Sequence, residues 1–259
     1  MRAYIPTPSF SYIALGPFKV HFYALFILIG IVVSLKVAQK RAPEKSELIS
    51  ELVLVAVPAG IVGARIFHVA TTPEKYFNKN FIDIFKVWEG GLGIWGAIAG
   101  GAIATFFALK KRGLSAQFLP IADALAPGLL LAQAIGRLGN WFNGELFGKP
   151  SSLPWALNIP IEKRPIEFIN FETFHPTFLY EAIWCLLLAL VLMRIKPNKP
   201  GQILWSYVTL YSIGRIFIET LRIDYSHIIL GVRLNILTSI FFVLIGAWQY
   251  LKIKRSEVG

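Results

Sequence analysis

Three arginines lie inside stretches of the chain that are otherwise almost entirely apolar. Arg65, Arg137 and Arg215 belong to three different stretches, and an ionised side chain within a bilayer costs a few kcal/mol on insertion scales. A guanidinium taken out of water needs a partner that accepts two hydrogen bonds at once, such as a carboxylate or a phosphate. The spacing of Arg215 and Glu219 by four residues favours a structural ion pair on one helix. Taken together, the arginines exceed what Glu219 and Glu145 could neutralise, which predicts a phosphate partner, most simply that of a lipid headgroup.

A second concentration of polar residues falls in the segment 136–148, which reads Gly-Arg-Leu-Gly-Asn-Trp-Phe-Asn-Gly-Glu-Leu-Phe-Gly. The pattern predicts a helix end, because its glycines permit close approach of another chain segment or a positive φ. Asn140 and Asn143 offer amide donors and acceptors that suit a ligand rich in hydroxyl or carbonyl oxygens. Glu145 adds a carboxylate, and Gly148 is expected to close the turn. This density of glycine, amide and charge beside an apolar helix predicts a ligand-binding turn.

The composition of the chain fits a membrane protein and excludes several other classes. Of its 259 residues, 55% are hydrophobic and only 16% are charged, whereas a soluble globular chain carries about 25% charged residues. Intrinsic disorder requires the opposite balance. A single cysteine excludes a disulfide scaffold, and with four scattered histidines it predicts neither a metal site nor a cofactor. The net charge of +11 indicates, in so apolar a chain, basic loops at an anionic membrane surface rather than nucleic-acid binding.

Seven stretches are predicted to be membrane-spanning helices, since a bilayer core about 30 Å thick needs roughly 20 apolar residues. They cover residues 20–35, 48–70, 90–109, 118–137, 178–193, 201–221 and 234–251. The first is expected to be a retained helix rather than a cleaved signal peptide, because no small-residue cleavage site follows it before Lys36. We therefore expect an all-α polytopic membrane protein in which residues 1–259 form a single transmembrane domain.

The distribution of lysine and arginine between the loops predicts the orientation. Four short stretches hold 13 basic residues, and the alternate, longer stretches hold 10. The denser set is expected to face the cytoplasm. The N-terminus then lies outside, the C-terminus lies inside, and residues 138–177 form an external loop or cap. This topology brings Tyr23, Arg65, Arg137 and Arg215 to the outer leaflet.

Three carboxylates within the predicted helices carry a weaker signal. Glu51 and Asp123 lie near the cytoplasmic ends of their helices and Glu181 near an outer end, so solvent is expected to reach all three. Cys185, in the middle of a leucine-rich helix, is expected to be a packing residue. A transporter of an anionic solute or lipid is the alternative function. It would be supported by an internal repeat and a midplane arginine site, and we find no repeat.

The segment 136–148 resembles the signature of the prolipoprotein diacylglyceryl transferases, and the resemblance continues along the chain. Further landmarks are His21-Phe22-Tyr23-Ala24-Leu25, Trp88-Glu89-Gly90-Gly91-Leu92, His175-Pro176-Thr177 with Leu179-Tyr180-Glu181, and Arg215 with Glu219 and Arg222. These landmarks span most of the chain in the order that the family shows. Seven helices with the N-terminus outside are also what the resemblance implies.

The resemblance implies an enzyme of a bacterial cell membrane, multi-pass, with its active site on the outer side. Members of the family transfer a diacylglyceryl group from phosphatidylglycerol to the cysteine thiol in the lipobox of a prolipoprotein signal peptide, and glycerol phosphate leaves. Neither a metal nor a cofactor is required. The residues implied in catalysis are Arg137, Arg215, Glu145 and Tyr23, and those implied in binding phosphatidylglycerol are Arg137, Asn140, Asn143, Gly148, Arg65 and Glu219.

Each of these residues has an implied task. Arg137 and Arg215 would bind the phosphate, and the two asparagines would orient glycerol or ester oxygens. Glu145 and Glu219 would hold the arginines in place. Tyr23 would contact the headgroup or the thiol.

The chain departs from the family at one position in the third predicted helix. Many members carry a histidine there to which a catalytic role is attributed, but this chain has Trp95, whose indole is no base. The acceptor of the thiol proton is therefore open. His21, His68, Glu145 and Tyr23 are candidates. Alternatively, arginines beside the thiol could lower its pKa until it ionises without a base.

Overall fold

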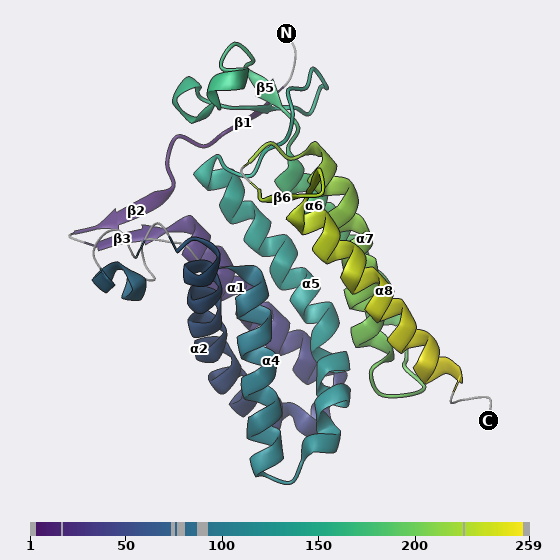
Figure 1. Cartoon of the computed structure of the whole chain (residues 1–259). Coiled ribbons are helices and arrows are strands. Elements are labelled where there is room, and N and C mark those ends of the chain that lie inside the picture. The colour runs from purple at the N-terminus through teal and green to yellow at the C-terminus, as the bar shows by residue number, and fades with distance from the viewer. Residues whose placement is uncertain are drawn as a thin grey trace. The chain divides into compact units, whose positions relative to one another are not determined.

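The computed structural model describes residues 4–16, 18–73, 76, 81–86, 93–224 and 226–255, and this part of the chain is mostly helical (Figure 1). The long helices are α1 (Phe22–Arg41), α2 (Ser46–Thr71), α4 (Ile94–Lys111), α5 (Phe118–Asn143), α6 (Thr177–Arg194), α7 (Gln202–Leu221) and α8 (Leu234–Arg255). Single turns of 3-10 helix cover Pro43–Lys45, Phe81–Phe85, Ser115–Gln117, Ile161–Lys163 and Ile166–Phe168.

Each of the seven predicted spans coincides with one of these long helices. Five of them, α1, α2, α5, α6 and α8, are long and apolar enough to cross a membrane, so the chain has the character of a multi-pass membrane protein. Helix α4 ends on Lys110 and Lys111, and α7 contains Arg215 and Glu219 within its apolar sequence. Seven spans and their orientation stay predictions.

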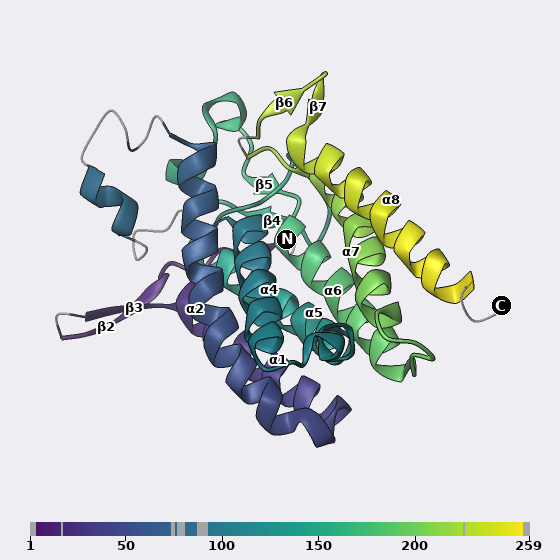
Figure 2. The ribbon, with the colours of Figure 1, turned by 60° about the horizontal axis from the view of Figure 1, so that its bottom comes forward.

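Three small sheets depart from the expected all-α pattern. In the first, β1 (Ile5–Pro6) runs parallel to β4 (Leu157–Asn158), which is antiparallel to β5 (Thr173–Phe174). The others are antiparallel hairpins. One consists of β2 (Tyr12–Leu15) and β3 (Phe18–His21), and the other, before α8, of β6 (Ile228–Ile229) and β7 (Val232–Arg233) (Figure 2). Strands of two to four residues are too short to leave a clear alternation in the sequence.

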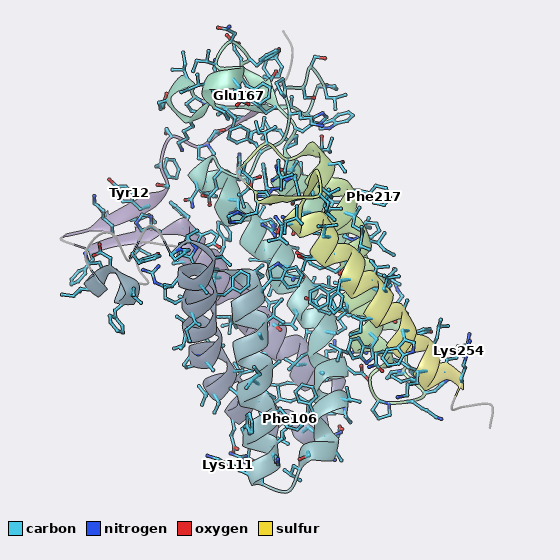
Figure 3. All side chains as sticks on the ribbon, in the orientation of Figure 1. Tyr12, Phe106, Lys111, Glu167, Phe217 and Lys254 are labelled. Carbon is cyan, nitrogen blue, oxygen red and sulfur yellow. The ribbon has the colours of Figure 1, made fainter. Side chains whose placement is uncertain are left out.

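The predicted loop or cap of residues 138–177 begins later than expected. Helix α5 continues to Asn143, and the helix stops only where Gly144 adopts a positive φ of 60°. Beyond it, the segment folds as a cap around β4 and β5, which also carries Glu167 (Figure 3). Its core buries the apolar side chains Phe147, Leu157, Ile159 and Phe174 together with Phe178 of α6. That this cap is external stays a prediction.

The chain divides into two compact units, Met1–Ala38 with Ala122–Gly259 and Gln39–Ile121. The single transmembrane domain therefore stays a prediction. In the second unit, α2 and α4 pack through glycines. A Cβ placed on Gly63 would lie 2.3 Å from the carbonyl oxygen of Gly96. Such close approach of backbones is a common way for membrane helices to associate, since lipid gives no hydrophobic drive between them.

In the first unit, helices α5, α6 and α7 share a buried core, and α7 and α8 lie side by side (Figures 1 and 2). Cys185 is fully buried in this core, as expected of a packing residue. The indole of Trp184 on α6 covers Gly214 on α7. A Cβ added to Gly214 would lie 2.1 Å from the Nε1 atom of Trp184. That same nitrogen donates to the carbonyl of Leu210 at 3.1 Å. Glycine at position 214 therefore fixes the distance between α6 and α7.

Asp123 corrects one prediction. Solvent is expected to reach it, but only 4% of the residue is exposed. Its two carboxylate oxygens accept the backbone N–H groups of Gly201 at 2.6 Å and Leu204 at 2.7 Å. These donors belong to the first turn of α7, whose N–H groups have no partner within the helix. Asp123 is thus a capping residue that ties α5 to the start of α7.

Candidate active site

The last turns of α5 carry the polar residues of the segment 136–148. The continuation of the helix to Asn143 puts Arg137 and Asn140 one turn apart on the same face. The Nη1 atom of Arg137 donates to Oδ1 of Asn140 at 3.3 Å. Asn140 is buried, with 4% exposed. The side-chain amide of Asn140 therefore links Arg137 to the residue that accepts the hydrogen bond from its Nδ2 atom.

That contact is Glu145. Its Oε1 atom accepts Nδ2 of Asn140 at 3.1 Å and Nδ2 of Asn143 at 2.9 Å. The predicted task of Glu145, to hold the arginines, is wrong for the described residues, because Arg137 and Arg215 form their ion pairs with other carboxylates. Glu145 holds the two asparagines instead.

Gly148 lies in a tight crossing of chain segments. Its N–H donates to the carbonyl of His175 at 2.8 Å, and it pairs as a short bridge with Arg222. A Cβ at this position would lie 2.8 Å from the carbonyl oxygen of Leu221. The geometry requires glycine for packing. A direct contact of Gly148 with lipid stays a prediction.

The landmark His175-Pro176-Thr177 fixes the turn after α5. Besides the contact of His175 with Gly148, the hydroxyl of Thr177 donates to the carbonyl of Leu146. Leu146 adopts a positive φ of 56°. Burial and the nearby charge of Lys149 lower the pKa of His175, which favours a neutral imidazole whose Nδ1 lies 3.1 Å from the hydroxyl oxygen of Tyr180.

Tyr23 lies in the first turn of α1 and packs on the last turns of α5. A Cβ added to Gly139 would lie 2.7 Å from Cδ2 of Tyr23. Since Gly139 directly precedes Asn140, the ring lies beside the helix turn that carries the amide contacts. Tyr23 is 38% exposed, so it retains a free surface. The structure thus brings together Tyr23 and the asparagines, as predicted for one site.

Glu181 is the residue at which the two predicted phosphate-binding arginines meet. Arg137 pairs with its Oε1 atom, and Nη1 of Arg215 pairs with its Oε2 atom at 2.8 Å. The hydroxyl of Tyr211 donates to Oε1 at 2.9 Å. The expectation that solvent reaches Glu181 is wrong, because only 2% of its side chain is exposed. A carboxylate so placed must be compensated by cations, which is what the two arginines provide.

Glu219 is enclosed by cationic and amide donors. Nη2 of Arg215 lies 2.7 Å from its Oε2 atom, which confirms the predicted pair at four-residue spacing. Its Oε1 atom accepts Nε of Arg233 at 2.8 Å and Nδ2 of Asn235 at 3.0 Å. None of its side chain is exposed. Glu219 therefore orients the arginines. Since none of its side chain is exposed, the structure offers no surface of Glu219 for a lipid, and that contact stays a prediction.

The sequence patterns do not reveal Arg233 and Asn235. Arg233 directly precedes the last predicted span, where a basic residue is expected to face water, and Asn235 is an uncharged residue within it. With Arg222 and Asp224 they extend the ion pairs. The connected ion pairs join four arginines (137, 215, 222 and 233) to three carboxylates (181, 219 and 224). One formal positive charge is left, which is a smaller excess than the sequence predicts.

Arg65 belongs to the second unit, and its described contacts lie there. Its Nε atom donates to the carbonyl of Ile84 at 2.6 Å, its Nη2 atom donates to the carbonyl of Asp83, and its guanidinium lies 5.2 Å from the ring centre of Tyr76. Only 7% of the residue is exposed. These contacts support a structural role, and binding of phosphatidylglycerol by Arg65 stays a prediction.

The segment 88–92, Trp95 and His68 add little to the description of the site. The segment 88–92, with its Gly-Gly pair, lies outside the described residues. Trp95, which replaces the family histidine, is half-buried in the first turn of α4. His68, one of the candidate bases, lies on α2, where its carbonyl accepts the hydroxyl of Thr72 at 2.7 Å.

The chain is similar to known proteins along nearly its whole length. A sequence model of the family described as prolipoprotein diacylglyceryl transferase matches residues 11–252. Proteins named phosphatidylglycerol–prolipoprotein diacylglyceryl transferase are similar to it. The one from Frankia casuarinae is 46% identical over 99% of this chain and 63% of its own length. Those from Bifidobacterium adolescentis and Cutibacterium acnes are 42% and 44% identical, each over 98% of this chain and over 81% and 88% of their own lengths.

The chain thus spans a little under two thirds of the Frankia relative and most of the other two. The resemblance inferred from the segment 136–148 and the other landmarks is confirmed by these matches. The protein belongs to the prolipoprotein diacylglyceryl transferase family.

Proposed function

We propose that this protein is a transferase that moves a diacylglyceryl group from phosphatidylglycerol to the lipobox cysteine thiol of prolipoproteins and releases glycerol phosphate. The observation that carries the proposal is the meeting of Arg137 and Arg215 at Glu181, next to the turn in which Asn140 and Glu145 are hydrogen-bonded. The similar proteins named above are transferases. The transporter alternative receives no support from them.

The arginines are suited to the leaving group of this reaction. The glycerol phosphate gains negative charge as the carbon–oxygen bond to the diacylglyceryl group breaks, and a guanidinium held ready stabilises that charge in the transition state. Arg137 and Arg215 keep 20% and 13% of their side chains exposed, whereas the carboxylate that they share is almost wholly buried. Their outer faces can therefore receive a phosphate while Glu181 fixes their inner faces.

The remaining residues orient the two substrates. Asn140 and Asn143 direct amide groups toward glycerol or ester oxygens, with Glu145 fixing both side chains. Tyr23 contacts the headgroup or the acceptor thiol from α1. Glu219 acts indirectly by holding Arg215 in place, and Gly148 by holding the turn after α5. Arg65 contributes to lipid binding.

The site belongs to a multi-pass protein of the bacterial cell membrane. Seven spans, an external N-terminus and a cytoplasmic C-terminus would place the active site on the outer side, where a prolipoprotein signal peptide presents its lipobox cysteine. The loop charges of the sequence support this orientation.

The test is a transfer assay with the purified protein in lipid nanodiscs. Phosphatidylglycerol labelled in its acyl chains is offered with a lipobox peptide, and we expect label on the peptide together with one glycerol phosphate for each transfer. A peptide with serine in place of the lipobox cysteine is the control. If no label reaches the cysteine peptide while the protein binds phosphatidylglycerol, the proposed reaction is wrong.

A further inference from the structure

Glu145 differs from the other carboxylates of the site in its partners. Glu181 and Glu219 are each ion-paired with two or more arginines and are almost completely buried. Glu145 is exposed, and in the described part of the chain its contacts are the amide groups of Asn140 and Asn143. Both amides bind Oε1, which leaves Oε2 without a hydrogen bond from the described residues. Of these three carboxylates, Glu145 is the one that has an oxygen available for a proton.

The backbone that carries Glu145 is held in an unusual conformation. Gly144 before it and Leu146 after it both have positive φ values, of 60° and 56°. For leucine this left-handed conformation is strained, and such strain persists only where the surroundings enforce it. The surroundings here are the hydroxyl of Thr177, which donates to the Leu146 carbonyl, and the carbonyl of Asn140, which accepts the Glu145 N–H at 3.1 Å. These contacts fix the backbone on both sides of Glu145, and they therefore restrict the positions that its carboxylate can take.

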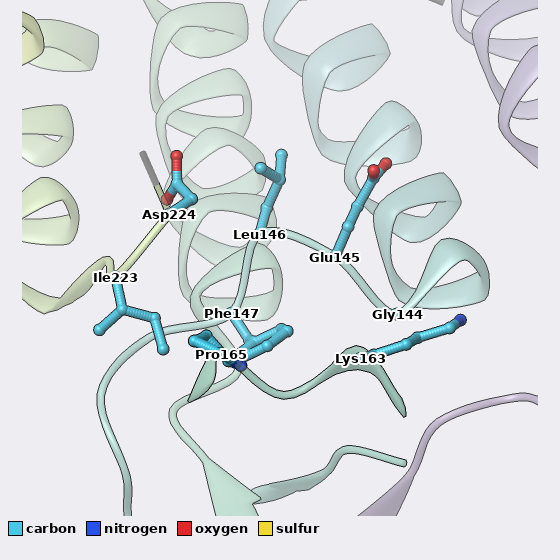
Figure 4. Close-up of a pocket in the computed structure, with 8 residues that line it drawn as sticks. All are labelled: Gly144, Glu145, Leu146, Phe147, Lys163, Pro165, Ile223 and Asp224. Atoms are coloured by element: carbon cyan, nitrogen blue, oxygen red, sulfur yellow. The ribbon is translucent and has the colours of Figure 1, made fainter. Parts of the chain in front are cut away.

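A cavity of about 240 Å³ adjoins this turn (Figure 4). Its lining combines apolar side chains, among them Phe147 and Ile223, with the charged residues Glu145, Lys163 and Asp224. The ammonium group of Lys163 donates to the carbonyl of Asn143 at 2.7 Å. The cavity is too small for a diacylglyceryl group, but it can receive a cysteine and the small residues beside it in a peptide. A thiol in it would lie beside Glu145.

The phosphate-binding residues are one side chain away. Asn140 contacts Arg137 through its Oδ1 atom and Glu145 through its Nδ2 atom. A nucleophile beside Glu145 and a leaving phosphate beside Arg137 would therefore be separated by a single amide group. A displacement at the glyceryl carbon requires this arrangement, because nucleophile and leaving group act on the same atom.

We propose that Glu145 is the general base that takes the proton from the acceptor thiol, an inference that rests on the proposed transferase function. The thiol proton passes to the Glu145 carboxylate as sulfur forms its bond to the glyceryl carbon. The carbon–oxygen bond to the phosphate breaks, and its electron pair leaves with glycerol phosphate beside Arg137. The protonated Glu145 then returns its proton to water. No histidine is needed in this scheme, which agrees with tryptophan at position 95.

The experiment compares two nucleophiles in the Glu145→Gln variant. Glutamine still accepts the asparagine amides through its oxygen, but it cannot take a proton. The acceptor is a lipobox peptide with either cysteine or selenocysteine, whose selenol is already ionised at neutral pH and needs no base. Transfer is measured in nanodiscs containing phosphatidylglycerol, at saturating lipid and over a pH range that includes the thiol pKa of about 8.5. Glu167→Gln, which changes an exposed carboxylate in the cap, is the matched control.

With the cysteine peptide near neutral pH, Glu145→Gln should lose at least roughly a hundredfold in kcat, the scale of a general base. The loss should shrink as pH rises toward the thiol pKa, and with the selenocysteine peptide it should stay within about tenfold. The control should match the parent throughout. A loss equal for both peptides and independent of pH would overturn the proposal in favour of a positioning role, as would parental transfer by Glu145→Gln.

If Glu145→Gln does not fold, Glu145→Asp decides, because a shorter carboxylate remains a base. Its transfer to the cysteine peptide should fall near neutral pH, whereas transfer to the selenocysteine peptide should stay close to parental, because only the thiol needs the base. An equal loss with both peptides would contradict the proposal. Failure of the proposed function is a separate outcome, since it appears as absent transfer by the unmodified protein.

Discussion

The Glu181→Gln substitution should disturb the orientation of Arg137 and Arg215 while leaving the charge of each arginine unchanged. In the structure, Oε1 of Glu181 receives Arg137 and the hydroxyl of Tyr211, and Oε2 receives Arg215. Glutamine has one acceptor oxygen, so its NH₂ group must face the donors of at least one of these partners. The substitution also raises the formal charge of the connected ion pairs by one.

The size of the effect depends on how many hydrogen bonds the substitution breaks. At least one charge-assisted hydrogen bond disappears, and each contributes about 1.5–3 kcal/mol. If the displaced arginine no longer meets the leaving phosphate, kcat should fall by about ten- to a hundredfold, since each 1.36 kcal/mol changes a rate tenfold. The KM for phosphatidylglycerol should not rise, because a carboxylate that competes with the phosphate for the same guanidinium groups has been removed. Breaking a buried ion pair should also lower the Tm of the protein.

The assay is transfer of labelled lipid to a lipobox peptide, with kcat and KM determined separately and Tm measured in the same nanodiscs. Glu181→Asp keeps the charge and should retain more activity than Glu181→Gln. Glu172→Gln, which alters an exposed carboxylate in the cap, should leave all three quantities unchanged. A folded Glu181→Gln variant with parental kcat, or one with a raised KM and unchanged kcat, would refute the positioning role assigned to Glu181.

The site and the topology support three further predictions. Arg137→Lys keeps the charge but loses the forked donors, and it should reduce transfer at least roughly tenfold; parental transfer in that variant would exclude a phosphate-binding role. In a Cys185→Ser background, a cysteine at Lys111 should resist an impermeant thiol reagent applied from outside, whereas one at the exposed Glu167 should react (Figure 3); labelling at Lys111 would overturn the orientation. His68→Gln should retain transfer within about tenfold, and a hundredfold loss in a stable variant would identify His68 as the base instead.

The helices can be predicted from the sequence, but their ends and the small sheets cannot. Long apolar runs reproduce all seven long helices, because hydrophobic length is the strongest signal that a membrane chain carries. The predicted end of α5 falls six residues early, at Arg137 instead of Asn143. Polar side chains suggest a loop there, although Asn140 and Asn143 lie in the helix and donate their amides to Glu145 just beyond its end. The strands depend on pairing between segments as distant as Ile5 and Leu157, which no local pattern reveals.

The candidate site can be predicted in its residue types but not in its pairing. Arg137, Arg215, Asn140 and Asn143 do lie together in one unit, as the sequence suggests. Position alone puts Glu181 near a helix end, which suggests contact with solvent. The rule applied to the arginines, that a charge within an apolar helix requires a partner, applies to Glu181 equally.

The segment 175–181 shows why pairing matters more than position. At its start, His175 and Thr177 hold the turn that carries Glu145. One helical turn later, Glu181 holds the two arginines. A single short segment at the beginning of α6 therefore fixes both the proposed base and the proposed phosphate-binding groups, which sets the distance between them. For a displacement reaction the relative position of nucleophile and leaving group strongly affects the rate, so a change in the first turn of α6 should affect kcat even where neither substrate touches it.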